Sequence, residues 1–68
     1  MKVKQVLQSE MVNENGTVIE IYRKMATMDR YERVADGYFF EHQVFKFEEV
    51  EVVELNYKRY PNIVTIFI

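Results

Sequence analysis

Few side chains in this sequence could carry out nucleophilic or acid–base chemistry. His42 is the only histidine, Ser9 is the only serine, and there is no cysteine. A catalytic nucleophile needs a base within hydrogen-bond reach and a third group that orients the base. One Ser–His pairing is available, and no motif surrounds either residue. We therefore predict that the protein is not an enzyme.

Metal and cofactor binding have little support in the sequence. His42 with Glu41 or Glu48 could ligate zinc or manganese, but no recognised spacing of ligands marks a site. The two glycines, Gly16 and Gly37, lie too far apart to form a glycine-rich phosphate loop. We predict neither a metal nor a cofactor.

Carboxylates are concentrated in one part of the chain. Residues 41–54 contain five glutamates and a single cation, Lys46, with Val50, Val52 and Val53 placed between the acids. Such charges often only keep a strand face hydrated and prevent aggregation. They could also steer a basic partner onto the valines. The predicted partner-binding residues are Glu41, Glu48, Glu49, Glu51 and Glu54.

A consecutive aromatic run suggests an alternative function. Tyr38, Phe39 and Phe40 follow a turn signal, and exposed rings beside cations can stack on the bases of single-stranded nucleic acid. The net charge of −2 gives no support for strong attraction to phosphate. Nucleic-acid binding is therefore the second choice.

Length and composition indicate a single ordered domain over residues 1–68. Of these residues 49% are hydrophobic and 15% aromatic. A chain this short buries only about 60% of its unfolded surface, so association with another copy would help to stabilise it. No apolar stretch approaches the roughly 20 residues that span a membrane. The lack of cysteine is consistent with a reducing compartment, and we expect a cytoplasmic protein without a membrane partner.

Turn signals divide the chain into strands. Asn15-Gly16 and Asp36-Gly37 predict two-residue hairpins, and Tyr60-Pro61-Asn62 marks a third break. The last strand, apolar on both faces, should be central or covered by a partner. We predict an all-β fold, a small antiparallel barrel or curled sheet of about five strands, over residues 3–12, 17–25, 31–35 with 38–47, 49–57 and 62–68.

Two features qualify that architecture. Residues 27–35 could instead form one short helix, with Gly37 beyond its C-terminus, which would make the fold α+β. The run 44–58 cannot stay straight in a compact domain, so we expect an extended strand whose buried face changes at a bulge or sharp bend near residues 48–51. Otherwise the far end of this strand would belong to a neighbouring chain. The predicted core includes Ile19, Ile21, Val53, Leu55 and Ile66.

Taken together, these patterns favour a non-enzymatic protein-interaction module. It would act as a homo-oligomer, or as a small inhibitor or adaptor of a larger and basic protein, through an acidic, valine-containing strand surface.

Overall fold

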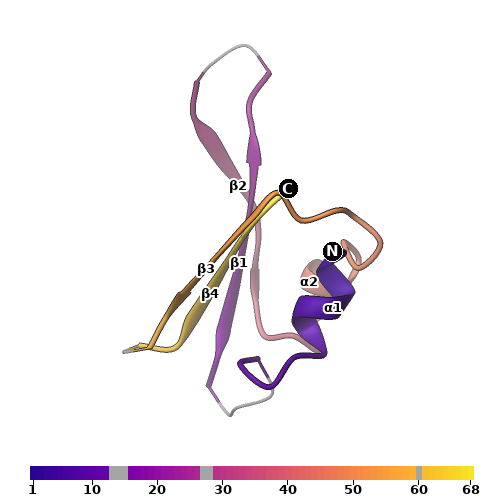
Figure 1. The fold of residues 1–68 in the computed structure, drawn as a ribbon, viewed down its shortest axis with the longest axis vertical. Coiled ribbons are helices and arrows are strands. Elements are labelled where there is room, and N and C mark those ends of the chain that lie inside the picture. The colour runs from indigo at the N-terminus through magenta and orange to yellow at the C-terminus, as the bar shows by residue number, and fades with distance from the viewer. Residues whose placement is uncertain (13–15, 27–28, 60) are drawn as a thin grey trace.

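Over the residues that the structure describes, the fold is a four-stranded mixed sheet with two short helices (Figure 1). A computed structural model describes residues 1–12, 16–26, 29–59 and 61–68. The sheet order is β2-β1-β4-β3, in which β1 pairs antiparallel with β2 and parallel with β4, and β3 pairs antiparallel with β4. The elements in chain order are α1 (Val3–Leu7), β1 (Val18–Lys24), β2 (Tyr31–Gly37), α2 (His42–Phe45), β3 (Glu54–Lys58) and β4 (Ile63–Phe67).

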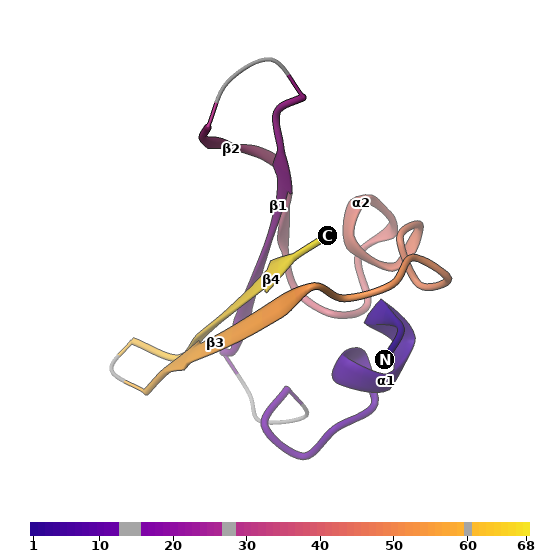
Figure 2. The same ribbon diagram turned by 45° about the horizontal axis from the view of Figure 1, so that its top comes forward.

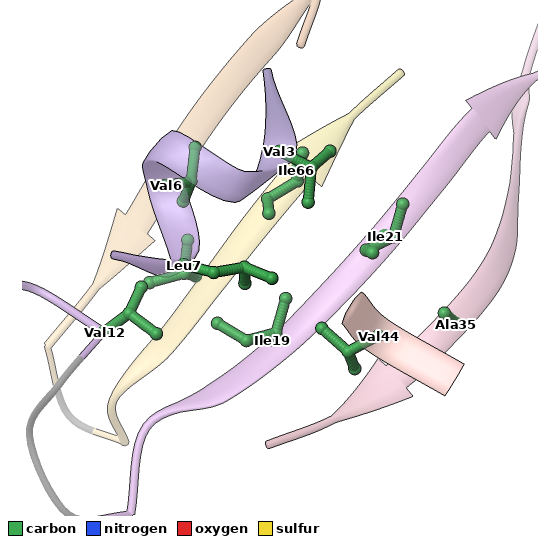
Figure 3. Close-up of a cluster of buried hydrophobic side chains, with 10 residues drawn as sticks. Val3, Val6, Leu7, Val12, Ile19, Ile21, Ala35, Val44 and Ile66 are labelled. Carbon is green, nitrogen blue, oxygen red and sulfur yellow. The ribbon is translucent and has the colours of Figure 1, made fainter. Parts of the chain in front are cut away.

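Both helices lie on the same side of the sheet (Figures 1 and 2). The side chains between the helices and the sheet form the hydrophobic core (Figure 3). Because side chains alternate along a strand, every second residue in most of β1 and β4 points into this layer and is buried. The buried core residues are Val3, Val6, Leu7, Val12, Ile19, Ile21, Ala35, Val44, Val64 and Ile66.

The predicted strand over residues 3–12 is wrong, because its first half is helix α1. Val3, Val6 and Leu7 are all buried, and their spacing of three and four residues places them on one face of a helix. The hairpin predicted at Asn15-Gly16 is wrong as well, since β1 pairs with β2 and β4 and not with residues 3–12. Gly16 has a positive φ of 85°, while Asn15 lies outside the described residues.

The second predicted hairpin is also replaced by a different structure. β2 runs without interruption to Gly37 and pairs with β1, so the strand predicted over 38–47 does not form. The Tyr38 amide donates to a carboxylate oxygen of Glu41 at 3.0 Å, and the chain turns there into α2. The alternative helix over 27–35 is wrong for residues 31–35, which belong to β2, while residues 27–28 lie outside the described part.

The run 44–58 is not one extended strand. Its first residues belong to α2, residues 46–49 form turns, and regular strand begins only at Glu54. The expected change of direction does occur near residues 48–51, but turns produce it and not a bulge in a continuous strand. The predicted antiparallel barrel or curled sheet of about five strands is therefore wrong in its strand number and pairing. Over the described residues the sheet is open, four-stranded and mixed, and the predominance of β structure is confirmed.

Several predictions about the centre of the fold are confirmed. β1 falls within predicted residues 17–25, and β4, within 62–68, is a central strand between β1 and β3. Pro61 and Asn62 lie in a turn between β3 and β4, as predicted, while Tyr60 lies outside the described residues. Of the predicted core residues, Ile19, Ile21 and Ile66 are fully buried, Leu55 is half-buried, and Val53 is 75% exposed, so its assignment to the core is wrong.

Candidate functional site

A groove beside α1 gathers aromatic and charged side chains. Its volume is about 330 Å³, enough for one or two side chains of a ligand. Phe39, in the turn that leads into α2, and Phe45, the last residue of α2, are 36% and 39% exposed. We call this the aromatic groove, lined by Lys4, Leu7, Gln8, Phe39, Phe45 and Glu48.

The predicted aromatic residues form one exposed cluster next to this groove. The rings of Tyr38 and Phe40 are stacked, with centroids 5.7 Å apart and planes 11° apart. The rings of Phe39 and Phe40 form a T-shaped pair with centroids 5.5 Å apart, and Phe40 itself is 65% exposed. The three residues singled out by sequence are therefore brought together, and they extend the apolar surface of the aromatic groove.

The five predicted glutamates do not lie on one strand. Glu41 precedes α2 and binds the Tyr38 amide and the Gln43 side chain. Glu48 lies in a turn and lines the aromatic groove, whereas Glu54 is exposed on β3. The expectation of one continuous acidic strand surface is thus wrong in its geometry, because the chain turns between these residues.

Glu49 and Glu51 pair with the start of the chain. Glu49 accepts from the Nζ atoms of Lys2 and Lys4 at 3.0 and 3.1 Å, and Glu51 contacts the Met1 amino group at 3.2 Å. Hydrogen bonds from the two lysines lower the pKa of Glu49 below its usual value, and the same contact raises the pKa of Lys2. These acids hold the N-terminal segment against the turn before β3.

The backbone reinforces that contact. The amide of Val3 donates to the carbonyl of Val50, and the amide of Lys4 donates to that of Glu48, both at 2.9 Å. The first amides of a helix have no partner within the helix, so these carbonyls satisfy the free end of α1. This attachment positions α1, whose residues Lys4 and Leu7 form one wall of the aromatic groove.

The Glu49 contact predicts a dependence of stability on pH. A carboxylate whose pKa is lowered by folding stabilises the fold above its unfolded pKa, and this contribution is lost as pH falls through the folded value. Glu49→Gln should therefore lose less stability than the parent between about pH 7 and about pH 3, as measured by urea unfolding. Glu32→Gln is the matched control, because Glu32 is exposed on β2 and no ion pair of its carboxylate occurs among the described residues. Equal pH slopes for the parent and Glu49→Gln would contradict this role.

The side of the sheet away from the helices is a second candidate surface. On the strands, the residues that alternate with buried Ile19, Ile21, Val64 and Ile66 point to this side. No described helix lies over it (Figure 2). We call it the open face; its apolar residues are Val18, Tyr22, Tyr31, Ile63 and Phe67, and its charged residues include Glu20, Arg33, Asp36, Glu54 and Lys58.

Aromatic rings from three strands meet on the open face. Phe67 of β4 stacks on Tyr22 of β1 with ring centroids 5.7 Å apart, and it forms a T-shaped pair with Tyr31 of β2 with centroids 4.8 Å apart. Tyr31 is 46% exposed. Sequence analysis missed this cluster, because its members become neighbours only once β1 pairs with both β2 and β4. The alternation of Val18, Tyr22 and polar residues in β1 was the available signal.

The residues considered for chemistry are placed separately. The Ser9 hydroxyl donates to the Val6 carbonyl at 2.6 Å, just beyond α1. The exposed His42 ring packs edge-on against Phe45 at 5.2 Å. Among the described residues, no three metal-ligating side chains cluster, and none of the helices is long or apolar enough to cross a membrane.

Comparisons with protein-family models, with curated proteins and with solved structures found no match for this chain. Function is therefore inferred from the two surfaces themselves.

Proposed function

We propose that this protein is a non-enzymatic interaction module that binds a larger protein through the aromatic groove. The observation that supports the proposal most is the position of Phe39 and Phe45, which leave more than a third of their surface exposed on the walls of one concavity. Large rings held in a preformed groove are typical anchors of protein interfaces, because burying them costs little conformational entropy.

The charge of the groove indicates the kind of partner. Glu48 lines it, and no ion pair of this carboxylate occurs among the described residues. The other charged residue of the lining, Lys4, already pairs with Glu49. An apolar side chain next to a lysine or arginine would fill the groove and meet Glu48. This is a narrower form of the acidic surface expected from sequence.

Selection from a random peptide library tests the proposal. We expect enriched peptides to contain a large apolar residue next to a basic one. Phe39→Ala should lower the affinity for the selected peptides by about 10-fold or more, because an anchor ring is lost. Tyr57→Ala is the control: Tyr57 is 41% exposed but lies on β3 and not in the groove.

Charge reversal makes the test sharper. Glu48→Lys should shift the selected peptides from basic to acidic residues while keeping the apolar anchor. Peptides that bind Glu48→Lys and the parent equally would contradict the assigned role of Glu48. If the chain instead binds short single-stranded oligonucleotides at low salt and loses them on Phe40→Ala, the nucleic-acid alternative replaces this proposal.

A further inference from the structure

We propose that the open face joins two copies of this chain face to face, around a two-fold axis parallel to the strands. The surface lies on the opposite side of the sheet from α1 and α2, and none of its residues lines the aromatic groove. The dimer and the groove can therefore be tested independently.

The strand register places opposite charges at the two edges of the open face, with aromatic rings between them. Tyr22 is paired with Arg33 on one side and with Phe67 on the other, and Phe67 is paired with Glu54. In-register partners share a face of the sheet. A single row therefore crosses the sheet from a cation on edge strand β2, through two rings, to an anion on edge strand β3.

This row is complementary to itself. A half-turn about an axis that runs along the strands, between β1 and β4, reverses the row. Glu54 of a second copy then lies over Arg33 of the first, and Phe67 lies over Tyr22. The symmetry repeats both contacts, so each dimer would gain two opposite-charge pairs around a central group of rings.

The two charged side chains are available for this contact. The side chain of Arg33 is 53% exposed and already approaches Glu20 at 3.4 Å and Asp36 at 3.9 Å. A guanidinium has five N–H donors, which leaves donors for a third carboxylate. Glu54 is exposed on β3, and no ion pair of its carboxylate occurs in the described ranges.

The size of the open face sets the expected affinity of the two copies for each other. Neighbouring strands lie about 4.8 Å apart, and a strand rises about 3.3 Å per residue. Four strands of about six residues therefore form a face of roughly 20 by 20 Å. Two such sheets can pack about 10 Å apart with their strands nearly aligned. The contact lies at the small end of specific interfaces, so we expect an association in the micromolar range.

Sedimentation velocity from about 10 µM to about 1 mM tests the inference. The parent, of 8.3 kDa, should approach twice this mass as concentration rises. Arg33→Glu alone and Glu54→Arg alone should each raise the dissociation constant about 10-fold or more, because like charges then face each other. An equimolar mixture of the two variants should associate again, because every facing pair in the mixed dimer has opposite signs.

Three outcomes would overturn the inference: a parent that stays at 8.3 kDa throughout, an Arg33→Glu chain that dimerises like the parent, or a mixture no tighter than its components. The second outcome would instead favour a two-fold axis perpendicular to the strands, since that axis leaves Arg33 unpaired and places Glu54 over Lys58. Circular dichroism of each variant confirms that the fold is retained, and the mixture provides a readout that misfolding of one variant cannot imitate.

Discussion

Replacing Val44 by aspartate should unfold the chain under conditions in which the parent is folded. Val44 is fully buried and points from α2 into the core between the helices and the sheet (Figure 3). A charge at this position would have no partner among the surrounding core side chains, and burying it costs more than about 3 kcal/mol. At roughly 0.05 to 0.15 kcal/mol per residue, a chain of 68 residues is stable by only about 3 to 10 kcal/mol, so a loss of this size is enough to unfold it. Circular dichroism would show the loss of structure.

The same substitution two residues earlier is the control. His42 is exposed at the first position of α2, where a carboxylate interacts favourably with the free amides of the turn. His42→Asp should therefore fold like the parent. A Val44→Asp chain with the parent's urea midpoint would show that α2 is not packed on the sheet, and the wall that carries Phe45 would then have no fixed position.

Replacing Ile66 by alanine should lower the free energy of unfolding by about 2 to 5 kcal/mol. Ile66 is fully buried on central strand β4, paired with Ile21 on one side and Leu55 on the other. The substitution removes buried apolar surface and leaves a cavity that the surrounding strands cannot fill completely. Urea unfolding measures the effect.

Val53→Ala provides the contrast for this experiment. The alternating pattern of the sequence suggests that Val53 belongs to the core, whereas the structure leaves it 75% exposed. Its replacement should change stability by no more than about 0.5 kcal/mol. A large effect at Val53 together with a small one at Ile66 would support the sequence-based core and contradict the observed packing.

The central strands could be predicted because their signals are local. In β4, Ile63, Val64, Ile66 and Phe67 are apolar on both faces, which indicates a strand inside a sheet. The parallel pairing of β4 with β1 could not be predicted in the same way. It joins residues 45 positions apart, such as Val18 and Ile63, and no turn between them fixes the register.

The helices were missed for different physical reasons. The spacing of Val3, Val6 and Leu7 is a helical signal, but Asn15-Gly16 favoured pairing the same residues in a hairpin. α2 has only four residues, too few for a helical period to appear in the sequence. It is fixed by the turn before it and by burial of Val44, both of which depend on the tertiary fold.

The candidate surfaces were predictable in composition but not in arrangement. The glutamates and the run Tyr38 to Phe40 are evident in the sequence. That Glu49 pairs with lysines 45 and 47 residues away, while Glu48 faces the groove, follows only from the packing of α1 on the turn before β3. The row from Arg33 to Glu54 likewise requires the register of all four strands.

The central claim is that the open face joins two copies of this chain. Nuclear Overhauser effects between the two copies test it most directly. A mixture of isotope-labelled and unlabelled chains restricts the signal to contacts between molecules. We predict effects from the Tyr22 ring of one copy to the Phe67 ring of the other, and from Val18 methyl groups to those of Ile63. Effects confined to Phe39, Phe40 and Phe45, or none at concentrations near 1 mM, would contradict it.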